Sequence, residues 1–136
     1  MPRARFLHLV RDARDVCFSN LRMLYSHVNG YSYKQDELAD FHRGYRRLMA
    51  HWHAVLPGRV LDVSYRDLVS DTERVVRDIC EFLGLPFAAA MLLPDANREV
   101  TTASAAQIRG GVRPPGNPAW EPYTEKLQPL FRALEE

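Results

Sequence analysis

The fold is decided by residues 7–19, which read Leu-His-Leu-Val-Arg-Asp-Ala-Arg-Asp-Val-Cys-Phe-Ser. An apolar run ends abruptly at Arg11, and a helical pattern begins directly after it. Arg11 therefore lies where a strand stops, and Ser19 lies two turns into the following helix. In open α/β sheets, ligands bind outside the carboxyl ends of the strands. An arginine at this position, with a hydroxyl on the next helix, predicts a site for one phosphate group. The guanidinium and the serine hydroxyl would both bind that phosphate.

The rest of the chain predicts one more strand and several helices. We expect a strand over residues 5–10, buried on both faces, and a second strand over residues 59–63. Apolar residues spaced by three and four predict helices, and Asn, Asp, Gly and Pro mark their ends. These helices cover residues 12–28, 36–55, 65–69, 71–83, 88–92 and 122–134. Two strands separated by helices predict a parallel pair with right-handed crossovers, in a sheet from which further strands are missing.

The predicted helix over residues 36–55 has two different faces. We expect its apolar face to be core and not a cofactor site, and its members are Leu38, Phe41, Tyr45, Leu48, Met49, Trp52 and Val55. The other face carries Arg43, Arg46 and Arg47. A solvated surface is the simplest interpretation of these arginines, and contact with an acidic acceptor is the alternative. His51 and His53 are two residues apart and point in different directions on a helix, so we expect no metal site there.

Composition excludes several classes of protein. The chain has 136 residues, enough for one domain, and a net charge of +1, which does not indicate nucleic-acid binding. No apolar run approaches the length of a membrane span, and the first residues do not resemble a signal peptide. Cys17 and Cys80 lie within apolar helical patterns, as small core residues do in a reducing compartment. We therefore expect a cytoplasmic protein.

Three separated motifs carry a family resemblance. The first runs from Arg11-Asp12 to Ser19, and the second is Val-Ser-Tyr-Arg-Asp-Leu-Val at residues 63–69, followed by Phe-Leu-Gly-Leu-Pro at residues 82–86. The third comprises Thr102-Ala103-Ser104 and Gln107-Ile108-Arg109, followed by Trp120 and Tyr123. In this order the motifs resemble the carboxyl-terminal portion of sulfotransferases that use 3′-phosphoadenosine 5′-phosphosulfate (PAPS). The most similar type is the bacterial group often joined to tetratricopeptide repeats, which resembles protein-tyrosine sulfotransferases.

The resemblance implies an α/β fold with a partial parallel sheet flanked by helices. This is the P-loop-nucleotide-hydrolase-like sulfotransferase fold without its amino-terminal strand and phosphate loop. It further implies a single truncated domain over residues 1–136, with residues 94–120 as a loop that covers the nucleotide. The Gly-rich loop for the 5′-phosphosulfate and the catalytic acid/base are expected upstream of Pro2, so the catalytic residues are unknown.

The resemblance also assigns roles to individual residues. Arg11 and Ser19 would grip the 3′-phosphate of the nucleotide, and Tyr65 would lie against the adenine or hydrogen-bond to it. The covering loop would contribute Ser104, Gln107 and Arg109, with Arg109 near the phosphate. Two positions depart from the family pattern: Ala119 replaces the usual Lys or Arg before the tryptophan, and Met23 replaces an arginine of the tyrosine-type enzymes.

These residues also have ordinary structural explanations. Arg11 would pair with Asp12 or Asp15 in many proteins, and Ser19 would be a plain helix serine. Tyr65 would be a core aromatic at a strand end, and Arg109 a solvated side chain. His8 is expected to be a hydrogen-bonded core histidine and not a base.

The implied reaction is transfer of a sulfuryl group from PAPS to an acceptor hydroxyl, on tyrosine or a small molecule, without a metal. This chain would carry the 3′-phosphate and adenine half of the site and be inactive alone. The alternatives are a non-catalytic nucleotide-binding or assembly module, completed by a separate amino-terminal half, and a decayed remnant. A kinase-like enzyme is disfavoured because the chain lacks Gly-x-x-x-x-Gly-Lys-Ser/Thr. We also expect self-association, because the strand over residues 6–10 would expose an unpaired edge.

Overall fold

The computed structural model describes residues 4–23, 25, 29–93 and 118–135. The chain divides into two compact units, and each unit combines segments that are distant in sequence. The first unit consists of Met1–Val10 and Leu61–Gly116, and the second of Arg11–Val60 and Asn117–Glu136. None of the helices in the described ranges combines the length and the apolar character of a membrane span.

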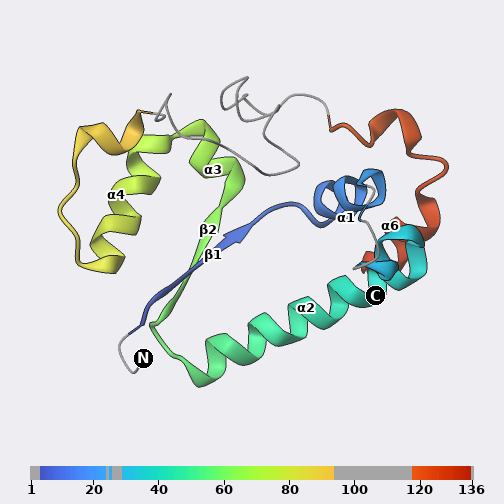
Figure 1. Cartoon of the computed structure of the whole chain (residues 1–136), viewed down its shortest axis with the longest axis horizontal. Helices are drawn as coiled ribbons and strands as arrows, with labels where there is room; N and C mark the ends of the chain where they lie inside the picture. The colour runs from blue at the N-terminus through green and yellow to red at the C-terminus, as the bar shows by residue number, and fades with distance from the viewer. Residues whose placement is uncertain (1–3, 24, 26–28, 94–117, 136) are drawn as a thin grey trace. The chain divides into compact units, whose positions relative to one another are not determined.

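The first unit is built on a two-stranded sheet. Strand β1 (Phe6–Val10) pairs with β2 (Val60–Ser64), and Figure 1 shows that both strands run in the same direction. Helices α3 (Tyr65–Ser70) and α4 (Thr72–Leu83) and the 3₁₀ helix η2 (Ala89–Leu92) follow β2. The predicted parallel pair and the predicted mixed α/β class are confirmed.

Strand β1 is not buried on both faces, so that expectation was wrong. Its apolar residues Phe6, Leu7, Leu9 and Val10 are all exposed, Leu9 to 54%, and only His8 is half-buried. A strand is buried on both faces where helices cover a wider parallel sheet. In the described part of the chain β1 has one neighbouring strand, β2, and the sheet is too narrow to bury it.

The exposed apolar residues of β1 favour self-association of the chain. The 136-residue chain should self-associate with increasing concentration in sedimentation velocity, because an apolar strand with an open edge is a template for pairing. Leu9→Lys should reduce the association by placing a charge on that strand.

Leu93→Lys is the matched control, since Leu93 is 74% exposed but lies outside β1. A monodisperse monomer with a sharp cooperative melt would contradict the prediction, and so would an equal effect of the two substitutions.

Helix α4 begins and ends where the sequence predicts. Asp71 caps its first turn by accepting a hydrogen bond from the backbone N–H of Arg74 at 3.3 Å, and Gly84 ends it in the left-handed conformation at φ 71°. Along its exposed side, Arg74 lies between Asp71 and Asp78, and Arg77 pairs with Glu73 at 2.6 Å. Local capping and ion pairs of this kind depend on neighbouring residues, so a sequence predicts them well.

Gly84 and Gly44 should respond to alanine in opposite directions. Gly84→Ala should lower the free energy of unfolding by about 1 kcal/mol, because a left-handed residue with a Cβ is strained. Gly44→Ala should raise it by about 0.5–1 kcal/mol, because Gly44 lies inside a regular helix and loses more backbone entropy than alanine on folding. A Cβ built at either glycine has no atom of another residue within 4 Å, so steric clashes do not contribute to the difference between the two variants.

Urea denaturation of the two variants and the parent chain measures both effects. Destabilisation by Gly44→Ala, or an unchanged stability for Gly84→Ala, would contradict this account of the two positions.

The second unit is helical. It contains α1 (Ala13–Arg22), the 3₁₀ helix η1 (Gly30–Tyr33), α2 (Gln35–Val55), the 3₁₀ helix η3 (Glu121–Tyr123) and α6 (Gln128–Glu135). Its core joins residues from α1, α2 and the carboxyl-terminal segment: Cys17, Phe18, Leu38, Ala39, Leu127, Leu130, Phe131 and Leu134. Helix α6 therefore supplies the apolar surface against which α1 and α2 pack.

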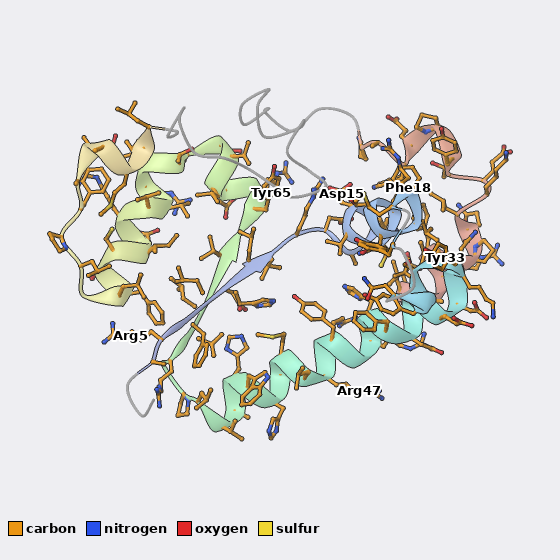
Figure 2. The ribbon with its side chains drawn as sticks, viewed as in Figure 1. Arg5, Asp15, Phe18, Tyr33, Arg47 and Tyr65 are labelled. Carbon is orange, nitrogen blue, oxygen red and sulfur yellow. The ribbon has the colours of Figure 1, made fainter. Side chains whose placement is uncertain are left out.

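Side-chain bonds to backbone groups fasten α2 to α6 at two places. The Gln35 side chain donates to the Lys126 carbonyl at 3.0 Å and accepts from the Leu130 N–H at 3.1 Å. Arg43 donates to the Ala133 carbonyl at 2.9 Å. Arg43 is thus half-buried and bonded, and the expectation of a solvated face holds only for Arg46 and Arg47, which are exposed. Figure 2 labels Arg47 on α2.

The apolar face of α2 is buried at only one end. Leu38 is fully buried together with its neighbour Ala39, whereas Phe41, Leu48, Trp52 and Val55 are all 41–51% exposed. The expectation that the whole face is core was wrong. The reason is that the bonds to α6 lie at Gln35 and Arg43, in the first half of a 21-residue helix.

Two of the predicted helices also differ from the structure. Helix α1 ends at Arg22, and Met23 is extended, with Asn20 bonded to the Val16 carbonyl and to the Tyr25 hydroxyl. The sequence also predicts Gly30 as the left-handed cap of the helix over residues 12–28, but Gly30 begins η1 and has no positive φ. The predicted helix over residues 122–134 is divided between η3 and α6.

Candidate functional site

Arg11 is the first residue after β1 and precedes the cap of α1. Its side chain is 45% exposed, and its Nε donates to the Oδ2 of Asp15 at 3.2 Å. The ion pair that the sequence offered as an ordinary explanation of Arg11 is therefore present. A guanidinium held in this way is oriented by a carboxylate one helical turn further along the chain.

Asp15 has a second partner from the far end of the chain. Its Oδ1 accepts a hydrogen bond from the indole Nε1 of Trp120 at 3.0 Å. The Trp120 ring meets Phe131 edge to face, with 5.1 Å between centroids, and the Arg14 guanidinium lies 4.8 Å from the Phe131 ring. Arg14 also pairs with Glu135 at 2.9 Å. Both oxygens of Asp15 are thus bonded, one to Arg11 and one to a tryptophan that packs against α6.

The amino terminus of α1 is already capped from within the chain. Asp12 Oδ1 accepts from the backbone N–H groups of Arg14 at 2.9 Å and Asp15 at 3.2 Å. Helix amino termini bind anions through such N–H groups when these are available. Here the Asp12 carboxylate occupies them, so an anion at this end of α1 must rely on side chains, and above all on Arg11.

Ser19 is exposed on α1, four residues after Asp15 and eight after Arg11. Residues four apart are neighbours on a helix surface, so Asp15 and Ser19 belong to one stripe, which Arg11 extends at its amino-terminal end. The structure brings Arg11 and Asp15 into contact and places Ser19 further along that stripe. Figure 2 shows Asp15 and Phe18 on α1, and Phe18 is the buried side chain of the pair.

Of the other predicted site residues, the structure describes Tyr65. Tyr65 is half-buried and is the first residue of α3, directly after β2. The Ser64 hydroxyl caps α3 by accepting from the Asp67 N–H at 3.2 Å, so the strand passes into the helix at Tyr65 without a loop. Ser104, Gln107 and Arg109 lie outside the described residues.

The cysteines and His8 behave as structural residues. Cys17 is buried, and burial, with a smaller effect of the Asp12 charge, raises the pKa of its thiol to about 11, so it is protonated at neutral pH. Cys80 is also a free, buried thiol. His8 bonds to Asp62 of the neighbouring strand at 2.7 Å, which confirms the expected hydrogen bond, although the histidine is only half-buried.

The sequence did not predict the hydrogen bond between Asp15 and Trp120. The spacing of four between Arg11 and Asp15 signals their contact, but nothing local connects Asp15 with a residue 105 positions away. The His8–Asp62 pair was missed for the same reason, since the register of two strands 54 residues apart is set by the fold.

Comparison with known proteins identifies the family. The sequence model of the sulfotransferase family matches residues 1–89, which include Arg11, Ser19 and Tyr65. This chain belongs to the sulfotransferase family. The match ends before the motif that contains Ser104, Gln107 and Arg109.

A relative from Aquifex aeolicus (strain VF5) is much longer than this sulfotransferase-family chain. That relative is an uncharacterised protein, 30% identical over 139 residues, and the alignment covers 99% of the chain. The chain spans only 18% of the relative's length. No solved structure matches the chain.

Proposed function

We propose that this chain forms the 3′-phosphate and adenine half of a PAPS site in a sulfotransferase. The observation that carries the proposal is the exposed Arg11 guanidinium, directly after β1 and inside the segment that matches the family. The reaction that we propose for the complete enzyme is sulfuryl transfer from PAPS to an acceptor hydroxyl.

The local chemistry supports side-chain recognition of a phosphate. Arg11 presents a planar, permanently charged donor, which suits a phosphate dianion. Ser19 adds a hydroxyl on the exposed side of α1. Because Asp12 occupies the first N–H groups of α1, the helix end does not compete with Arg11 for the anion.

The remaining roles come from the family resemblance. Tyr65 offers an aromatic face or a hydroxyl to the adenine. The loop over residues 94–120 would cover the nucleotide and supply Ser104, Gln107 and Arg109. We extend the proposal to the P-loop-nucleotide-hydrolase-like sulfotransferase fold, whose Gly-rich loop would come from outside this chain.

The proposed division of labour has a chemical basis. Sulfuryl transfer requires positive donors that neutralise charge on the sulfonate and on the leaving phosphate, and a base that orients the acceptor hydroxyl. In this proposal the chain binds the 3′-phosphate and the adenine of the nucleotide, and the reaction uses no metal. In this proposal the base that orients the acceptor hydroxyl comes from outside this chain, so we expect the chain alone to be inactive.

Calorimetric titration of the chain with 3′-phosphoadenosine 5′-phosphate, and with AMP for comparison, tests the proposal. The parent chain should bind the first nucleotide more tightly, because only that one carries a 3′-phosphate. Arg11→Ala should weaken its binding by about 1.5–3 kcal/mol, the range for a hydrogen bond to a charged group.

Arg47→Ala is the matched control, because it removes an equal charge from an exposed position on α2. Equal affinity of Arg11→Ala and the parent would overturn the phosphate assignment. A folded chain that binds neither nucleotide would favour the remnant or the assembly module.

A further inference from the structure

We propose that Asp15 is a positioning residue that holds the Arg11 guanidinium for the 3′-phosphate, and that Trp120 holds Asp15 in turn. This inference rests on the proposed function, because it concerns the same site. It assigns to Asp15 and Trp120 a role that acts through Arg11, and it makes phosphate recognition depend on the carboxyl-terminal segment.

An acidic group stands beside the proposed phosphate site. Asp15 lies on the α1 stripe between Arg11 and Ser19, the two residues proposed to hold the phosphate. An uncompensated carboxylate at this position would repel the anion and would compete for Arg11. Asp15 can therefore assist phosphate binding only if other groups of the protein bind its carboxylate and hold the side chain in one orientation.

The Asp15 carboxylate meets both conditions. Its Oδ2 accepts from Arg11 Nε at 3.2 Å, and its Oδ1 accepts from Trp120 Nε1 at 3.0 Å. The Asp15 side chain is only 25% exposed. A carboxylate bonded at both oxygens resists rotation, so it holds the guanidinium plane in one orientation.

Trp120 is itself held firmly. Its ring lies edge to face on Phe131, which is part of the buried core, and the Arg14 guanidinium lies 5.8 Å from it. The series Phe131–Trp120–Asp15–Arg11 therefore runs from the α6 core to the exposed guanidinium. Removing Trp120 or Asp15 should loosen the orientation of Arg11 and leave the charge of the guanidinium unchanged.

The test uses 3′-phosphate selectivity, the ratio of the dissociation constants for AMP and for 3′-phosphoadenosine 5′-phosphate, measured by calorimetry on the full chain. Asp15→Asn should lower this ratio about tenfold, the lower end of the loss seen when the orienting partner of a metal ligand is removed. Asp15→Glu, which keeps a carboxylate, should lie closer to the parent than Asp15→Asn does.

Asp12→Asn is the matched control. It removes an equal negative charge from the residue next to Arg11, and asparagine caps a helix as well as aspartate does. A simple loss of repulsion would raise phosphate affinity in both variants, whereas a positioning role lowers selectivity only in Asp15→Asn. A selectivity in Asp15→Asn that equals or exceeds that of Asp12→Asn would overturn the proposal.

Trp120→Phe provides an independent variant, and it keeps the proposal testable if Asp15→Asn does not fold. It removes the indole N–H and retains an aromatic ring against Phe131. Selectivity should fall while the melting temperature changes little, a combination that a purely structural role would not produce. If Trp120→Phe folds and keeps the selectivity of the parent chain, Trp120 does not hold Asp15 for phosphate binding. That result would overturn the proposal.

Failure of the proposed function and failure of the positioning role give different results. A parent chain without 3′-phosphate selectivity overturns both together. A selective parent that loses selectivity in Arg11→Ala but keeps it in Asp15→Asn overturns the positioning role alone.

Discussion

The second unit depends on the burial of one face of α6 between α1 and α2. Leu130, Phe131 and Leu134 fill the space that Cys17 and Phe18 of α1 and Leu38 of α2 would otherwise leave open to water. This contact joins segments that are about a hundred residues apart, and apolar burial is the dominant favourable contribution to folding. The polar bonds of Gln35 and Arg43 to the α6 backbone then fix the direction of the packed helices.

The same contact organises the candidate site. Because α6 is packed on α1, Trp120 lies beside Asp15, and Asp15 bonds to Arg11. The exposed guanidinium is thus connected, through two side chains, to the most buried part of the unit. A binding residue supported in this way loses little freedom when its ligand arrives, which is the general advantage of preorganisation.

Much of the fold could be predicted because its signals are local. Asp71 and Gly84 bound α4 where the sequence predicts, and the helix predicted over residues 36–55 begins one residue earlier and ends at the predicted residue. Predictions failed where a helix or strand depends on its neighbours. The face of α2 that contains Trp52 has the periodicity of a core helix, yet periodicity does not reveal how much of a 21-residue helix will find a partner. The exposure of β1 has the same cause, since the width of the sheet decides it.

The sequence by itself determined that an arginine follows the first strand, that a serine follows it eight residues later, and that these residues belong to a sulfotransferase-like pattern. Those features reside in residue order, and short-range backbone preferences turn them into a strand end and a helix. Only the tertiary structure decided that Asp15 lies between Arg11 and Trp120, because residues 105 positions apart meet only when α6 packs against α1. The identity of the proposed binding residue, Arg11, is local information, whereas the contacts that support it come from the packing of the whole unit.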